Sequence, residues 1–141
     1  MNSNTAIFTS LVGMLGVMLG ASLQFYFARR TEAFKQFQAN KAQAYIDFVR
    51  AVSGRSIAQK HHNKEKEFEF TSLLADAKTR IAVYGSKDVV STVASFFRDH
   101  GSLNKPESME VFIKVIQTMR IHTIKENGGV TDKDIESLLF L

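Results

Sequence analysis

Hydrophobic residues are distributed unevenly along this chain. The stretch from Ala6 to Ala28 contains no charged side chain, and the first charge in the sequence is Arg29. As a helix, these 23 residues would rise about 34 Å, which is enough to cross a hydrocarbon core of about 30 Å. We therefore expect residues 1–30 to form a transmembrane anchor and residues 31–141 to form a helical domain.

Small and polar residues follow one face of the predicted anchor. They recur at steps of three or four residues, which places them on a single side of a helix: Thr9, Gly13, Gly16, Gly20 and Gln24. A GxxxG pair lets two helices approach closely in lipid, and an amide at membrane depth favours a partner. This stripe predicts a homo-oligomer interface, although glycine is also common in membrane helices that do not associate.

Beyond the anchor, apolar residues recur at helical spacing. The pattern predicts an all-α fold with one transmembrane helix followed by a cytoplasmic bundle of four to five helices. The expected segments are 31–53, 67–84, 86–100, 106–126 and 131–140. The first of these is expected to continue from the anchor without a break, as one long rod that ends near Gly54. Val89 to Val93 is the one run that also suits a strand.

Residues with strong local preferences set the expected boundaries. Gly54 to Lys66 is the most polar run and predicts a helix end and a loop, or a frayed extension of either neighbouring helix into the run. Gly85 is expected to end one helix and Ser86 to cap the next. Pro106 suits a first helical turn. Asn127 to Gly129 is expected to end that helix.

The last helix is predicted to begin with a capping box. Thr131 and Asp134 have the T-x-x-D spacing of that motif. The helix ends in the apolar run from Leu138 to Leu141, which is expected to dock on the bundle or in a subunit interface.

Charge adds an orientation to this picture. The net charge is +4, and residues 29–66 contain nine Lys or Arg against three Asp or Glu. The positive-inside rule then places the N-terminus outside and the domain in the cytoplasm, anchored in the inner membrane with its basic segment near anionic lipid.

A cleaved signal peptide and a buried helix of a soluble protein are the alternatives for the apolar segment. The chain has no Cys, which excludes disulfides and thiolate metal sites.

No catalytic constellation or cofactor motif is present, so we expect a protein that is not an enzyme. The four histidines are His61, His62, His100 and His122, and neither their number nor their spacing supports a metal site. Duplex nucleic acid is not an expected partner, because lipid explains the basic segment better.

The best ligand candidate is the interhelix turn around Gly85. A helix N-terminus attracts anions, and the residues expected to bind one are Arg80, Tyr84, Ser86, Lys87 and Arg120. The structural alternative is an ordinary turn, with Arg80 paired to Asp76 one helical turn away. For Arg120 the alternative is an internal ion pair with a carboxylate.

Two segments, AKTRIAVYGSKDVVSTVASFF and MRIHTIKENGGVTDKDIESLLFL, resemble a broad group of small bacterial membrane-anchored helical proteins. In architecture, the chain also resembles CRISPR-associated membrane effectors that pair a membrane helix with a domain binding cyclic oligoadenylate. The likeness implies a membrane effector in antiviral defence with a cyclic nucleotide as its ligand. The rival hypothesis is a scaffold subunit that tethers a protein partner through its apolar C-terminus and its Phe34 and Phe37 face.

Overall fold

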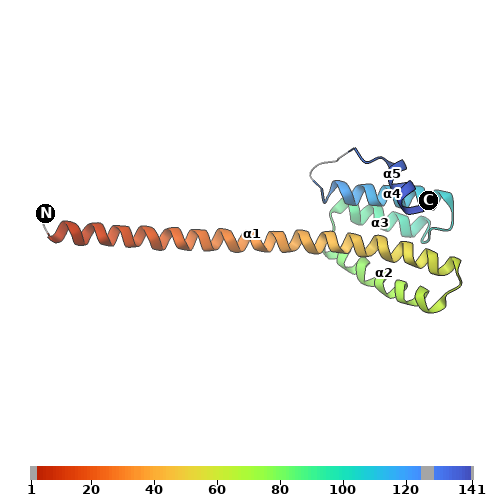
Figure 1. Ribbon diagram of the computed structural model, residues 1–141, viewed down its shortest axis with the longest axis horizontal. Coiled ribbons are helices and arrows are strands. Elements are labelled where there is room, and N and C mark those ends of the chain that lie inside the picture. The colour runs from red at the N-terminus through yellow and green to blue at the C-terminus, as the bar shows by residue number, and fades with distance from the viewer. Residues whose placement is uncertain (1–2, 125–128, 141) are drawn as a thin grey trace. The chain divides into compact units, whose positions relative to one another are not determined.

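The computed structural model describes residues 3–124 and 129–140, with side chains from Phe8 onward. Within these residues the chain forms five helices and no strand (Figure 1). The helices are α1 (Ser3–Lys60), α2 (Lys64–Tyr84), α3 (Lys87–Asp99), α4 (Pro106–Ile121) and α5 (Asp132–Phe140). The all-α class predicted from the apolar spacing is therefore confirmed, and the run from Val89 to Val93 is helical.

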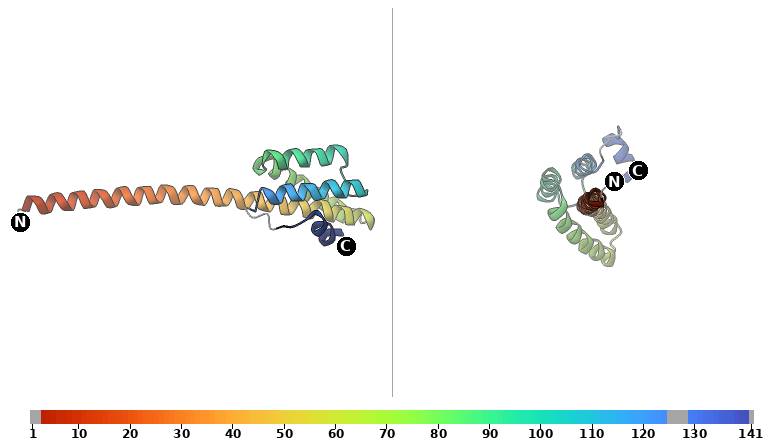
Figure 2. Two further views of the ribbon diagram at one scale, coloured as in Figure 1. Left: turned by 90° about the horizontal axis from the view of Figure 1, so that it is seen from above. Right: turned by 90° about the vertical axis from the view of Figure 1, so that its left-hand side faces the viewer.

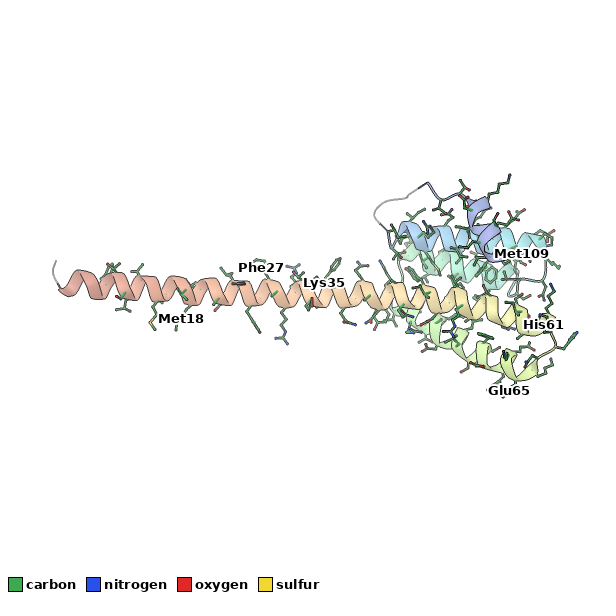
Figure 3. The ribbon with its side chains drawn as sticks, viewed as in Figure 1. Met18, Phe27, Lys35, His61, Glu65 and Met109 are labelled. Carbon is green, nitrogen blue, oxygen red and sulfur yellow. The ribbon has the colours of Figure 1, made fainter. Side chains whose placement is uncertain are left out.

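Contacts divide the chain into two compact units, residues 1–37 and residues 38–141. In the first unit, every large apolar side chain from Phe8 to Phe27 is more than half exposed. Met18, Phe27 and Lys35 project from α1 in Figure 3. Apolar groups so fully exposed on one helix need an apolar environment outside this chain.

By length and composition, α1 is able to cross a membrane. Its most apolar window has a mean hydropathy of 1.7 and is 0% buried. A signal sequence near an N-terminus meets the same criteria. The uncharged segment was predicted to begin at Ala6, and the side chain of Ala6 is not among those that the structure describes.

The second unit has a single core in which aromatic rings from three helices meet. Phe48 of α1, Phe96 of α3 and Phe112 of α4 are each fully buried. The Phe96 and Phe112 ring centroids lie 5.6 Å apart, and those of Phe48 and Phe112 lie 6.3 Å apart. α4 also contacts α5, and α3 contacts α2 (Figure 2). The C-terminal part of α1 is therefore an integral helix of this bundle.

The predicted end of the first helix near Gly54 is wrong, because α1 continues to Lys60. Gly54 lies in the helix interior, where a Cβ atom would overlap the Phe70 ring of α2. Glycine is present there because α2 packs closely, and its conformational freedom is not used. A glycine that allows close packing and a glycine that ends a helix look the same in a sequence.

The predicted polar loop is also shorter than expected, since only residues 61–63 separate α1 from α2. Asn63 caps α2, its side-chain oxygen accepting a hydrogen bond from Lys66 N at 3.0 Å. Glu65 and Glu67 lie in the first turn, which suits the helix dipole. His61 and Glu65 flank this turn in Figure 3. The charged run is therefore largely helical, with Ala58 buried within it and Lys60, Lys64 and Lys66 exposed.

The predicted turn between α2 and α3 is confirmed in position. Ser86 caps α3 by accepting a hydrogen bond from Val89 N at 3.5 Å. Gly85 ends α2 in an extended conformation with φ −69°. A Cβ there would overlap the Ile81 carbonyl oxygen, so space rather than a left-handed backbone requires this glycine.

The predicted end of the α4 segment at Asn127 to Gly129 is wrong, because α4 ends at Ile121. Asn127 and Gly128 lie outside the described residues. Side chains bind the carbonyl groups at the end of α4. Thr123 Oγ1 donates a hydrogen bond to Met119 O at 2.7 Å, and Lys41 Nζ donates one to the carbonyl of His122, the residue after the helix, at 3.0 Å. Lys41 is only 9% exposed. It therefore belongs to the bundle and is not a basic residue free to contact lipid.

The two predicted helix starts in the C-terminal part are confirmed. Pro106 is at the first turn of α4. The capping box of α5 is complete, since Asp134 accepts from Thr131 N at 2.8 Å and Asp134 N donates to Thr131 Oγ1 at 3.3 Å. Ile135 is buried and Phe140 packs on the core, whereas Leu138 is 84% exposed. The apolar terminus therefore docks on the bundle only in part, and Leu141 lies outside the described residues.

Candidate functional site

Arg80 lies between two carboxylates. Its guanidinium donates to Asp47 of α1 and to Asp76 of α2, each at 2.7 Å. The predicted pair with Asp76 is confirmed, whereas the pair with Asp47, 33 residues away, is revealed only by the tertiary structure. The Asp47 side chain is 15% exposed and the Asp76 side chain 60%. The more shielded bond is therefore the one between helices.

These carboxylates hold the charge of Arg80 in place. The hydrogen bond to Asp47, followed by that to Asp76, raises the pKa of Arg80 above its ordinary value, although partial burial works in the opposite direction. Two negative groups already compensate one positive group. An incoming phosphate would meet a guanidinium whose charge two carboxylates already compensate through Nη2.

Among the other residues of the predicted turn, Ser86 contacts Tyr45 of α1. The Ser86 backbone N–H donates to the Tyr45 hydroxyl at 3.3 Å, while the Ser86 side chain caps α3. Tyr84 is half-buried, and Lys87 is exposed at the start of α3. The turn is thus bound to α1 through Tyr45, and both polar groups of Ser86 have partners within the chain.

Arg120 lies in a different place, in an open groove between α1 and α4 that Leu138 of α5 borders. The groove has a volume of about 510 Å³. Among the described residues, ten line it: Ala42, Tyr45, Ile46, Val49, Ile116, Met119, Arg120, Thr123, Ile124 and Leu138. Arg120 is the one charged residue among them, and most of the others are apolar. The chemistry is that of a small-molecule site, apolar with few polar groups.

The internal ion pair that the sequence suggested for Arg120 is not found with any carboxylate among the described residues. In the part of the chain that the structure describes, Arg120 makes no salt bridge, and its shielded Nε has no hydrogen-bond partner. Arg120 as a whole is half-buried, and an anion beside its guanidinium would compensate the charge. The groove therefore offers one partly shielded positive group beside an apolar surface.

The structure divides the five predicted ligand residues into two sets. Tyr45 lines the groove with Arg120, whereas Asp47, two residues further along α1, binds Arg80. Two residues correspond to about 200° around a helix. Arg80 and Arg120 therefore lie against nearly opposite faces of α1. Ser86 is linked to the groove side through Tyr45.

Sequence reasoning missed three residues of α1 that organise this region: Lys41, Tyr45 and Asp47. Each is polar within an otherwise apolar helical repeat. That pattern signals buried polar groups with distant partners, but it does not identify the partners.

The predicted oligomer stripe lies on α1, in the first unit. Cβ atoms added at Gly13, Gly16 or Gly20 would meet no atom within 4 Å. Gln24 is exposed, as is Thr9. The stripe is thus accessible along its length to a molecule outside the chain.

No family model, characterised protein or solved structure matches the chain. Among the described residues, no cluster of three or more His, Asp or Glu is arranged to hold a metal ion. The groove and the exposed apolar part of α1 are therefore the features that bear on function.

Proposed function

We propose that this chain is a non-enzymatic, self-associating, single-pass membrane protein whose helical domain binds a small ligand in the groove between α1 and α4. The observation that supports this proposal most strongly is that α1 contributes to both features. The large apolar side chains from Phe8 to Phe27 are exposed, and Ala42, Tyr45, Ile46 and Val49 line the groove. A ligand in the groove would contact the same helix that enters the membrane.

The charges around the groove favour a small amphiphilic ligand over a nucleotide. A nucleotide needs several donors for its phosphates and polar contacts for its base and sugar. The groove has one guanidinium, and Arg80 lies elsewhere with its charge compensated. A role in antiviral defence remains a hypothesis from architecture.

A scaffold role is the second candidate, and exposed apolar side chains favour it. Ile46 is 60% exposed and Leu138 84%, and both border the groove. A protein partner would cover them. This role predicts that a partner co-purifies with the full chain and is lost when Ile46 and Leu138 become polar.

Membrane insertion and orientation are tested by fusing reporters to the C-terminus of the full chain. We expect the protein to resist alkaline extraction from membranes. A C-terminal fluorescent reporter should fluoresce and a C-terminal alkaline phosphatase should be inactive, because the domain is placed in the cytoplasm. Extraction into the soluble fraction, or an active phosphatase, would contradict the proposal.

A further inference from the structure

The groove residues specify a ligand more narrowly than the proposed function does. Seven of the ten lining side chains are hydrocarbon or thioether: Ala42, Ile46, Val49, Ile116, Met119, Ile124 and Leu138. Tyr45 is also lining, but its hydroxyl already accepts a bond from Ser86 N. Most of any occupant must therefore be apolar, because polar groups placed on this surface would lose their bonds to water.

The head group of the occupant follows from Arg120. Arg120 is the charged residue among the described residues that line the groove, and it makes no salt bridge within the described part of the chain. Lys41 adds a second positive charge nearby, bound to the carbonyl of His122, and the His122 ring faces Asp88 at 3.2 Å. Asp88 is 68% exposed and is engaged by His122. The local charge therefore favours an anion, and a carboxylate fits the planar guanidinium through two parallel hydrogen bonds.

The size of the site favours a small molecule over a second protein chain. A volume of about 510 Å³ lies within the roughly 300–1,000 Å³ range of small-molecule sites. A standard protein interface uses about 20–30 residues on each side, whereas ten residues line this groove. A single flexible hydrocarbon chain also adapts to an open groove better than a folded surface does.

We infer that the groove binds a single-chain amphiphile with a carboxylate head group, of which a long-chain fatty acid is the simplest. The carboxylate pairs with Arg120, and the hydrocarbon chain lies along Ile46, Ile116 and Met119. This inference rests on the proposed function, since it names the ligand of the same groove.

The chain contains no cysteine, so one introduced thiol reports on the groove without further changes. Ile46→Cys places the thiol at the groove, and Ser72→Cys places a control thiol on the exposed surface of α2. The full chain in phosphatidylcholine nanodiscs is alkylated with and without palmitate. Hexadecanol and hexadecyltrimethylammonium are the neutral and cationic comparisons of equal chain length.

We expect saturating palmitate to slow alkylation at Ile46→Cys about fivefold or more and to leave Ser72→Cys unchanged. Hexadecanol should need a higher concentration, and the cation should protect least. Shortening the fatty acid should weaken protection by up to about fourfold for each methylene removed. Arg120→Gln should raise the palmitate concentration for half-protection about tenfold or more, and Arg120→Lys should fall between. Native helicity in circular dichroism confirms that both variants fold.

Three outcomes would overturn the inference. Equal protection by all three amphiphiles would remove the role of Arg120. Protection without amphiphile that rises with protein concentration would assign the groove to a second copy. No protection by any amphiphile, with membrane insertion and orientation as proposed, would reject the fatty acid and leave the membrane part of the proposed function standing.

Discussion

At the scale of single residues, the structure decides what each arginine is for. Arg80 and Arg120 look alike in the sequence, since both follow an apolar helical face. Arg80 is neutralised by Asp47 and Asp76, while Arg120 has no carboxylate partner among the described residues. Arg120 therefore lacks the two compensating carboxylates that Arg80 has, and it lines the groove.

The two partners of Arg80 should contribute unequally to stability. Asp47→Asn should lower the free energy of unfolding by about 1–2 kcal/mol, because it weakens a shielded, charge-assisted bond between α1 and α2. Asp76→Asn is the matched control and should cost about 0.5 kcal/mol or less, since that pair is largely exposed. Thermal unfolding followed by circular dichroism measures both variants, and equal losses would contradict this ranking.

At the scale of helices, close packing of α1 against α2 depends on one glycine. Gly54→Ala places a methyl group against the Phe70 ring. Overpacking of this kind costs about 1–3 kcal/mol, which exceeds the gain of roughly 0.5–1 kcal/mol from replacing glycine within a helix. We expect a net loss of stability in the full chain.

The same substitution made together with Phe70→Leu isolates the packing effect. With the ring removed, Gly54→Ala should become neutral or stabilising, because only the helix propensity remains. The double-mutant cycle in thermal unfolding measures this coupling. Additive effects of the two substitutions would show that the helices do not pack closely at this point.

The cap of α5 should depend on pH. Hydrogen bonds from the Thr131 side chain and then from its backbone lower the pKa of Asp134 below its ordinary value of 3.8. Since the folded pKa is the lower one, the stabilisation is complete above about pH 4 and is lost as pH falls through the lowered pKa. Thr131→Ala should therefore raise the Asp134 pKa toward 3.8, as measured by NMR titration of its carboxyl carbon.

Glu67 provides an internal control for this titration. Its pKa is also lowered, chiefly by the hydrogen bond from Gln59, on a different part of the bundle. Thr131→Ala should leave it unchanged. Movement of both pKa values together would indicate a general loss of structure rather than removal of the α5 cap.

At the scale of the whole molecule, the glycine stripe is the feature that reaches beyond one chain. Gly16→Leu with Gly20→Leu should lower the oligomeric state in detergent, because larger side chains prevent close approach of two helices. No atom of the chain lies within 4 Å of either added Cβ, so the change should not disturb the monomer. Val17→Leu is the control on another face.

Light scattering of the full chain in detergent measures this oligomeric state. An unchanged state in the glycine variant would assign any self-association to residues 38–141. A reduced state in the Val17→Leu control as well would show that the effect is not confined to the stripe.

The amino-acid sequence by itself determined the features that depend on neighbours within a few residues. The all-α class, the apolar segment, the Ser86 cap, Pro106 in the first turn of α4, and the Thr131–Asp134 capping box all follow from helical period and local hydrogen bonding. These interactions join residues at most four apart, so periodicity and spacing are sufficient to recognise them.

Only the tertiary structure decided how distant residues are used. It placed Gly54 against Phe70, Lys41 on the carbonyl of His122, and Asp47 on Arg80. It also gathered α1, α4 and Leu138 into the groove around Arg120. The physical reason is that these contacts depend on which helix faces pack together, and a helical pattern shows that a face is apolar without showing what covers it.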